Sequence, residues 1–196
     1  RKTLYVGLLK YLLKFAETHQ HEVEFINDVN QTTDITLDTV NDFAKWLNPC
    51  ARGVPIQIRD YQTIAVHKAI QDQRTLLVSP TASGKSFIIY LLTRFYVDTL
   101  DMKVLIVVPT TSLVEQMASD FIEYNGGEEL DIHKIRGGAD KNKDASITIT
   151  TWQSVYKLKK DWFAKFDVVV GDEAHLFKAK SLTSVLEKMP ECQYRY

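Results

Sequence analysis

From residue 75 onward, the chain alternates short apolar runs with segments of helical periodicity, and this alternation constrains the fold more than any other feature. Strands that alternate with helices are typical of a parallel sheet with helices on both faces, so the expected class is α/β with a doubly wound parallel sheet. Ser112 and Glu115 fit a capping box, which predicts a helix start at this point. The predicted strands span residues 75–79, 104–108, 132–135, 147–150 and 167–170.

The first 50 residues follow a different pattern. Short strands predicted at 3–6 and 22–26 flank a helical stretch at 8–19, which makes a small β-α-β element. Thr36 is the predicted N-cap of one more helix. That helix should end before the breaking residues Asn48, Pro49, Gly53 and Pro55.

We therefore expect a small amino-terminal α/β unit over residues 1–53 and the main domain over 54–196. The chain opens at Arg1 without an initiator Met, and it stops at Tyr196 on entering a strand. On these grounds we expect truncation at both ends.

Residues 79–86, Ser-Pro-Thr-Ala-Ser-Gly-Lys-Ser, follow an apolar run and precede a helical run, as a phosphate-binding loop requires. In such a loop, backbone N–H groups bind phosphate oxygens, the lysine neutralises phosphate charge and the hydroxyl ligates magnesium. Ser79 stands where the common pattern has its first glycine, and an ordinary helix start with a surface lysine is the alternative. The candidate nucleotide-binding residues are Thr81, Ala82, Ser83, Gly84, Lys85 and Ser86, with Ser86 also a candidate magnesium ligand.

A second candidate site follows the last predicted strand, where an apolar run leads through Gly171 into Asp172 and Glu173. An aspartate at this position can bind magnesium, and the next glutamate can orient and polarise water. A solvated pair of acids would be the simpler interpretation if the pair stood alone. It does not stand alone, because the phosphate loop, residues 109–111 and residues 150–151 also follow predicted strands. Parallel strands of one sense end at one edge of a sheet, so these motifs should converge on a nucleotide site there.

The order and spacing of these motifs resemble those of superfamily-two helicases of the DEAH-box type. Within that group, the small amino-terminal unit and the Thr-Trp-Gln-Ser segment are most similar to the bacteriophage UvsW-type recombination helicases. The resemblance implies a RecA-like lobe of the P-loop NTPase class, with ATP and Mg²⁺ as cofactors. It is carried by Arg-Asp-Tyr-Gln at 59–62, the phosphate loop, Pro-Thr-Thr-Ser-Leu-Val-Glu-Gln at 109–116, Gly-Gly at 137–138, Thr-Thr-Trp-Gln-Ser at 150–154 and Asp-Glu-Ala-His at 172–175.

The resemblance also implies roles for individual residues. Gln62 would recognise the adenine edge with Arg59 nearby, although a solvated Gln in a helix capped by Asp60 is the alternative. Lys85, Asp172 and Glu173 would be catalytic, and His175 would link hydrolysis to strand movement unless it is simply a surface histidine. Contacts with the sugar-phosphate backbone of a tracked strand are implied for Pro109, Thr110, Thr111, Gln116, Gly137, Gly138, Thr150, Thr151 and Gln153. Hydroxyls, amides and helix N-termini bind phosphates without reading sequence, so these assignments are physically sensible.

The net charge of −1 argues against a protein that coats nucleic acid through its overall charge, so any contact should be local. Residues 131–165 hold eight Lys or Arg against four Asp, which fits either a backbone-tracking face or a solvated surface. Trp152, Trp162 and Phe163 could stack on bases, but we favour core packing for all three.

The two cysteines, Cys50 and Cys192, are far apart and have no His or Cys at metal-ligand spacing, so neither a disulfide framework nor a zinc site is indicated. No apolar run reaches the roughly 18 residues of a membrane span, and no cleavable signal is visible. We therefore expect a cytoplasmic protein without a membrane partner, in the host cytoplasm if the chain is of phage origin.

Together these features predict the ATP-binding lobe of an ATP-dependent DNA helicase or translocase that remodels branched DNA in recombination and repair. DNA is the expected partner, and RNA is possible. By the resemblance, arginine fingers belong to a second RecA-like lobe, so this chain alone should bind nucleotide and hydrolyse it poorly.

Two alternatives remain open. A duplex translocase motor subunit of the restriction-enzyme type would share the motifs without separating strands, which a strand-displacement assay distinguishes. A nucleotide-dependent DNA-binding module would lack DNA-stimulated ATP hydrolysis.

Overall fold

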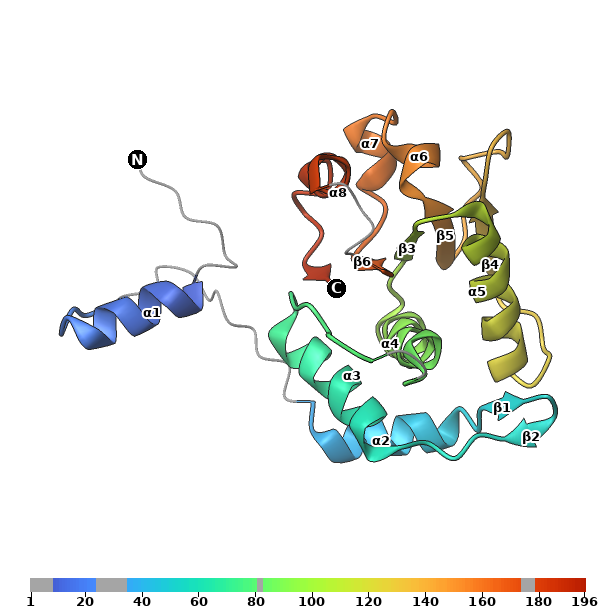
Figure 1. Cartoon of the computed structure of the whole chain (residues 1–196), viewed down its shortest axis with the longest axis horizontal. Helices are drawn as coiled ribbons and strands as arrows, with labels where there is room; N and C mark the ends of the chain where they lie inside the picture. Colours follow the sequence, from blue (N-terminus) through green and yellow to red (C-terminus); the bar gives the residue numbers. More distant parts are fainter. Residues whose placement is uncertain (1–8, 24–34, 81–82, 174–178) are drawn as a thin grey trace. The chain divides into compact units, whose positions relative to one another are not determined.

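The structure is a computed structural model and describes residues 9–23, 35–80, 83–173 and 179–196. The chain forms two compact units, Arg1–Thr33 and Asp34–Tyr196. In the first unit the structure describes one helix, α1 (Leu9–Thr18), where the sequence predicts residues 8–19 to be helical (Figure 1). The strand predicted at 3–6, and residues 24–26 of the next one, lie outside the described residues.

The two units divide at residues 33 and 34, earlier than the boundary expected near residue 53. The reason is α2 (Leu37–Trp46), which buries Val40 and Ala44 in the same core as α3 (Asp60–Asp72) and so belongs to the larger unit. Thr36 caps α2 as expected, because its Oγ1 accepts a hydrogen bond of 3.2 Å from the Thr39 backbone N–H.

The larger unit contains a five-stranded parallel sheet with the order β4-β5-β3-β6-β7. This confirms the predicted α/β class and the parallel sheet. Four of the five predicted strands are present, and β7 is added at the end of the chain. The strands are β3 (Val104–Val108), β4 (Ile132–Ile135), β5 (Ile147–Thr151), β6 (Val168–Gly171) and β7 (Tyr194–Arg195).

Helices cover both faces of this sheet, as Figure 1 shows. Alternate residues of β3 face opposite sides, so Ile106 joins the core with α3, α4 and α5, while Leu105 joins the core with α6, α7 and α8. Both residues are fully buried, and the sheet is the middle layer of three. The remaining helices are α4 (Lys85–Leu100), α5 (Thr111–Tyr124), α6 (Trp152–Val155), α7 (Lys160–Phe163) and α8 (Ala179–Glu187). No helix among the described residues is long and apolar enough to cross a membrane.

The predicted strand at 75–79 is wrong in the structure, where this segment has no strand. An isolated bridge between Arg74 and Arg195 of β7 lies just before this segment, and the Thr75 N–H donates to the Arg195 carbonyl at 3.1 Å. Arg195 is the last residue of β7, and Tyr196 pairs with β6 instead. With no strand of the described chain opposite, Leu76 and Val78 stay 71% and 90% exposed.

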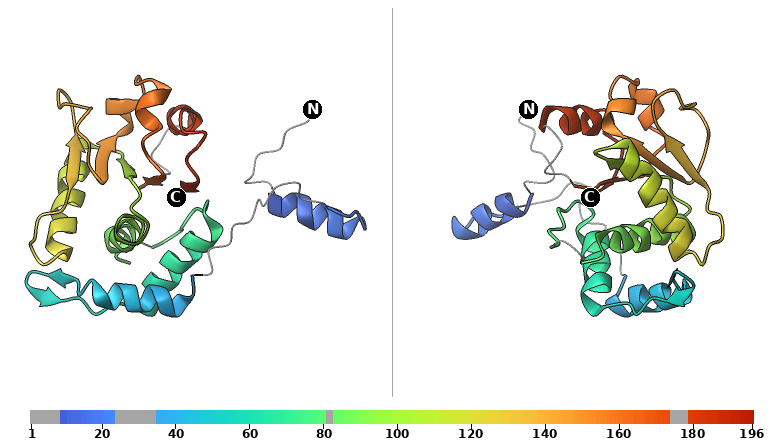
Figure 2. Two further views of the ribbon diagram at one scale, coloured as in Figure 1. Left: turned by 180° about the vertical axis from the view of Figure 1, so that it is seen from behind. Right: turned by 45° about the vertical axis from the view of Figure 1, so that its right-hand side comes forward.

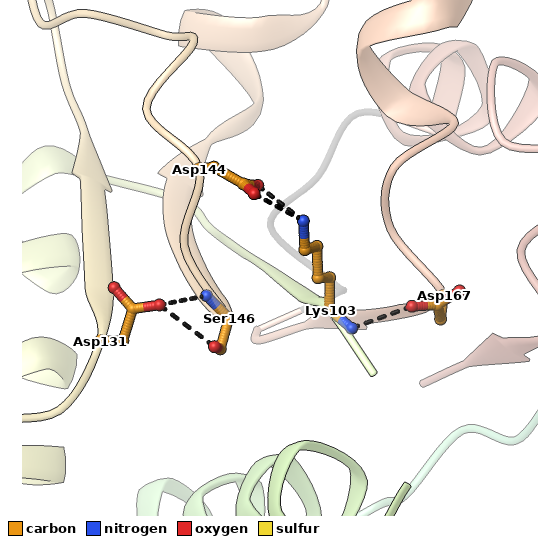
Figure 3. A network of polar contacts seen from close by, with 5 residues as sticks. All are labelled: Lys103, Asp131, Asp144, Ser146 and Asp167. Carbon is orange, nitrogen blue, oxygen red and sulfur yellow. Dashed lines mark hydrogen bonds and ion pairs between the residues drawn. The ribbon is translucent and has the colours of Figure 1, made fainter. Parts of the chain in front are cut away.

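A polar network joins the residues that precede four of the strands, as Figure 3 shows. The Lys103 ammonium contacts Asp144 at 2.7 Å, and the Lys103 backbone N–H donates to Asp167 at 2.9 Å. Asp131 accepts hydrogen bonds from the Ser146 backbone N–H and hydroxyl at 2.7 and 3.1 Å. These contacts fix the amino ends of β3, β4, β5 and β6, so the motifs at the carboxyl ends of those strands are held in a common register.

A short hairpin, β1 (Cys50–Ala51) with β2 (Val54–Pro55), lies beside the carboxyl end of α5 in both views of Figure 2. Its turn residue Arg52 donates a backbone hydrogen bond of 2.6 Å to Glu123 of α5. This hydrogen bond connects the hairpin, which precedes α3, with α5. The N-terminus of α5 lies at the candidate nucleic-acid site.

Candidate nucleotide and nucleic-acid site

The phosphate loop leads into α4 through Gly84, whose φ of +78° lies in the left-handed region that favours glycine. Two side chains of α3 hold the preceding residue: the Tyr61 hydroxyl donates to the Ser83 carbonyl at 2.8 Å, and the Gln62 amide donates to the same oxygen at 3.4 Å. Thr81 and Ala82 lie outside the described residues. The described end of the loop is therefore fixed to α3 by hydrogen bonds within the chain.

Gln62 is only 5% exposed, which contradicts the alternative of a solvated surface residue. Its side-chain oxygen accepts a hydrogen bond of 3.0 Å from the Arg59 backbone N–H, so Arg59, and not Asp60 as predicted, is the N-cap residue of α3. An Arg59 guanidinium N–H donates to the Tyr61 hydroxyl at 3.0 Å. Arg59 and Gln62 thus meet next to the phosphate loop.

We expect Gly84→Ala to lower both stability and nucleotide affinity. A Cβ at this position would lie 2.7 Å from the Gln62 amide nitrogen, and the φ of +78° is unfavourable for alanine. Gly53→Ala is the matched control, since its φ is +73° but no described heavy atom lies within 4 Å of the added Cβ.

Urea unfolding should show a loss of about 1–2 kcal/mol for Gly53→Ala from backbone strain alone. Gly84→Ala should lose about 1 kcal/mol more, because the Gln62 hydrogen bonds must shift. Equal losses in the two variants would contradict the contact between Gln62 and the loop.

Lys85 and Glu173 form an ion pair, although they are 88 residues apart in the sequence. The contact brings the first residue of α4 to the acid pair that follows β6. The hydrogen bond with Glu173 is the main reason why the pKa of Lys85 is raised. Glu173 has a φ of +52°, a left-handed conformation that a non-glycine residue rarely adopts, and its N–H donates to the Asp172 carboxylate at 2.9 Å. Strained residues of this kind concentrate at functional sites.

Ser86 lies at the end of the phosphate loop, and its hydroxyl hydrogen-bonds the Tyr124 hydroxyl of α5 at 2.9 Å. Asp120, on the same helix α5, has a raised pKa. Burial of its carboxyl group is the main cause, and the negative charge of Glu123 acts in the same direction. Sequence reasoning did not single out Tyr124, since a tyrosine at the end of a helix carries no motif. A magnesium ion at Ser86 would have to replace this hydroxyl partner.

The predicted nucleic-acid residues converge on a groove of about 570 Å³ at the carboxyl ends of β4, β5 and β3. Most of the lining residues lie at the end of one of these strands or directly after it, as expected for the common edge of a parallel sheet. The strand β6, which neighbours β3, ends at Gly171 and leads directly into Asp172 and Glu173, so the groove and the acid pair share this edge. The lining residues are Pro109, Thr110, Thr111, Arg136, Gly137, Gly138, Lys141, Thr151, Gln153 and Ser154.

Two residues predicted to contact a nucleic-acid strand do not line the groove. Thr150 is fully buried, and its hydroxyl donates to the Ile135 carbonyl at 3.3 Å. It lies within β5, all of whose residues are buried between the sheet and the helices that cover it. Gln116 is exposed on α5, one turn beyond the groove. The capping box predicted at Ser112 is also displaced, since Thr110 caps α5 by accepting a hydrogen bond of 3.3 Å from the Leu113 N–H.

Two cations line the groove, Arg136 and Lys141, which the sequence showed only as members of a basic stretch. Trp162 fixes the second of them, because its indole N–H donates to the Lys141 carbonyl at 2.7 Å. Trp162 also packs edge-to-face against Phe163 and at a tilt against Phe166, with ring centroids 4.9 and 5.2 Å apart. Its packing role, expected from the sequence, is confirmed.

Glu115, whose predicted role was in the capping box, instead forms ion pairs with Lys134 at 2.7 Å and Arg136 at 2.9 Å. The hydrogen bond from Lys134 is the main reason why the pKa of Glu115 is lowered. Two of the basic residues between 131 and 165, Lys134 and Arg136, are therefore paired with a carboxylate of the protein itself. His175, the remaining member of the acid motif, lies outside the described residues.

A parallel sheet with a phosphate loop, an acid pair and a polar groove at one edge defines a RecA-like nucleotide-binding lobe. Residues 55–194 match the family model described as the type III restriction enzyme, res subunit. The crystal structure of the UvsW helicase from bacteriophage T4 is similar at a TM-score of 0.88 and 32% identity, over 98% of this chain and 70% of that one. The chain belongs to this restriction-enzyme res-subunit family within the superfamily-two helicases.

Two curated relatives have named activities. The ATP-dependent DNA helicase uvsW of Enterobacteria phage T4 is 34% identical over 197 residues, which is 97% of this chain and 39% of that protein. The DNA 3'-5' translocase XPB2 of Sulfurisphaera tokodaii is 30% identical over 140 residues, which is 71% of this chain and 30% of that protein. The chain thus spans well under half the length of either relative.

Proposed function

We propose that this chain is the ATP-binding lobe of an ATP-dependent DNA helicase or translocase that remodels branched DNA in recombination and repair. The observation that carries the proposal is the ion pair between Lys85 of the phosphate loop and Glu173 after β6. It joins the two motifs on which phosphate binding and water activation depend, and the groove at the same sheet edge gives room for a strand. The named activities of the relatives support the proposal.

The residues present fit Mg-ATP. Lys85 supplies the positive charge for the β- and γ-phosphates, and Gln62 with Arg59 would contact the base edge. Ser86 and Asp172 are the proposed oxygen ligands of magnesium, which when bound neutralises phosphate charge. The described residues contain no cluster of three or more acidic, His or Cys side chains, and magnesium commonly takes one or two carboxylates plus substrate phosphates.

Glu173 is the proposed base that orients and polarises the attacking water. Glu173 forms an ion pair with Lys85, the residue proposed to bind the γ-phosphate, so the carboxylate and the γ-phosphate would compete for the same ammonium group. Exchange of the carboxylate for the γ-phosphate would free Glu173 to accept a water proton only when substrate is present. His175 is proposed to link hydrolysis to strand movement, and Thr81 and Ala82 to complete the phosphate loop.

The groove is proposed to bind the sugar-phosphate backbone of a DNA strand. Thr110, Thr111 and Gln153 offer hydroxyl and amide groups, and the N-terminus of α5 opens into the same groove. Donors of this type hold phosphates without reading bases, so binding should be independent of sequence. A second RecA-like lobe is proposed for the full-length protein, and RNA remains a possible alternative strand.

Titration of single-stranded DNA at several salt concentrations tests the groove. The logarithm of the affinity should fall by about 0.7 per neutralised phosphate for each log unit of salt. Lys141→Ala should flatten this slope by about that amount, because Lys141 lines the groove. Lys143→Ala removes the same charge from an exposed neighbour that does not line it, and should leave the slope unchanged. Equal slopes in both variants would argue against the groove.

A further inference from the structure

The two cations that line the groove differ in their partners. Among the described residues Lys141 makes no ion pair, whereas Arg136 is paired with Glu115 at 2.9 Å. Glu115 contributes nothing to the groove lining itself. It reaches Arg136 from the second turn of α5, the helix whose capped N-terminus opens into the groove.

The surroundings of Glu115 hold its carboxylate in this position. One carboxylate oxygen contacts the Lys134 ammonium at 2.7 Å and the other contacts the Arg136 guanidinium at 2.9 Å. The oxygen that faces Arg136 is itself buried and has no hydrogen-bond partner among the described residues, so the ion pair with the guanidinium compensates its charge. Helix α5 and strand β4, which carry these residues, pack against each other in the core.

Carboxylate and phosphate oxygens both bind guanidinium groups, so the Glu115 oxygen that contacts Arg136 takes a position that a phosphate oxygen could take. We propose that Glu115 is a built-in competitor for the phosphate that Arg136 would bind, and therefore lowers the affinity of the groove for a DNA strand. The proposal rests on the proposed strand-binding function of the groove. The pairing with Glu115 neutralises Arg136, and a phosphate must displace Glu115 from it.

Weak strand affinity is useful to a protein that must release each phosphate as it moves. Glu115 gives Arg136 an alternative partner at the moment of release, so the guanidinium is never left without a counter-charge. Lys134, exposed on β4, keeps the carboxylate compensated while Arg136 is engaged elsewhere.

The test measures single-stranded DNA binding to this chain for the wild type, Glu115→Gln, Arg136→Ala and the double variant. Glu115→Gln should bind about two- to fivefold more tightly, the range expected for an exposed ion pair. Its salt slope should steepen by about 0.7, because Arg136 is then free to neutralise one more phosphate and to release that phosphate's condensed counterion from the strand. In the Arg136→Ala background, Glu115→Gln should change the affinity much less.

Glu129→Gln is the matched control, since it makes the same change in net charge at an exposed position beyond the other end of α5. It should leave the affinity near that of the wild type. Thermal unfolding of each variant checks that the fold is retained.

An unchanged or weaker affinity of Glu115→Gln, with wild-type binding present, would overturn the role of Glu115 and leave the groove intact. A gain that persists fully without Arg136, or that Glu129→Gln reproduces, would also overturn it. If the folded wild-type chain binds no strand and Arg136→Ala changes nothing, the groove fails and the role of Glu115 fails with it.

Discussion

Glu173→Gln in the full-length protein is expected to reduce ATP turnover by about two to four orders of magnitude, the usual worth of a general base. The substitution keeps the size of the side chain and its hydrogen-bonding capacity but removes the charge that polarises water. Steady-state hydrolysis in the presence of DNA measures the effect. The Mg-ATP complex of the variant should then persist on DNA.

The ion pair between Glu173 and Lys85 also leads to an expectation for the Mg-ATP affinity of this variant. In the wild type, Glu173 competes with the γ-phosphate for Lys85, so Glu173→Gln should bind Mg-ATP at least as tightly as the wild type. Asp172→Asn, one residue away, should instead lose the magnesium-dependent part of the affinity. Equal loss of nucleotide affinity in both variants, or near-normal turnover in Glu173→Gln, would contradict the division of roles.

Part of the fold could be predicted from the sequence because β3 is a continuous apolar run and β6 is apolar up to Gly171. β3 is buried along its whole length, and a continuous apolar run such as Val104–Val108 is typical of a parallel strand that is covered on both faces. The segment 75–79 has the same apolar character, yet a strand also needs a neighbour. Whether a neighbouring strand is available depends on the whole sheet, and the local sequence of the segment does not show it.

The boundary of the larger unit shows a similar limit. Breaking residues such as Gly53 and Pro55 mark a turn, and the structure has a hairpin there. The sequence does not show that α2, which precedes this turn, buries Val40 against α3. A turn between two helices and a boundary between two units have the same local signature.

The candidate site was predictable in its motifs and less so in its side-chain partners. Motifs after parallel strands must meet at one edge, which is why Thr111, Gly137 and Gln153 share a groove. The partner of a long charged side chain depends on packing. Glu115 therefore pairs with Arg136 instead of capping α5, and the capping role falls to Thr110.

Lys85→Ala is expected to weaken Mg-ATP binding by about 1.5–3 kcal/mol, the worth of hydrogen bonds to a charged group. The substitution also leaves the Glu173 carboxylate without the ammonium partner it has in the structure, close to the incoming phosphates. The fold should be retained, because the Lys85 side chain lies in a partly open site and not in the core. Lys68→Ala is the control, since it removes an equal charge from an exposed ion pair on α3.

Calorimetric titration of Mg-ATP into the wild-type chain and Lys85→Ala tests the central claim, that this is an ATP-binding lobe, most directly. The wild type should bind at one saturable site, Lys85→Ala should bind about 10- to 150-fold more weakly, and Lys68→Ala should match the wild type. A folded wild-type chain that does not bind Mg-ATP, or an unchanged affinity in folded Lys85→Ala, would contradict the claim.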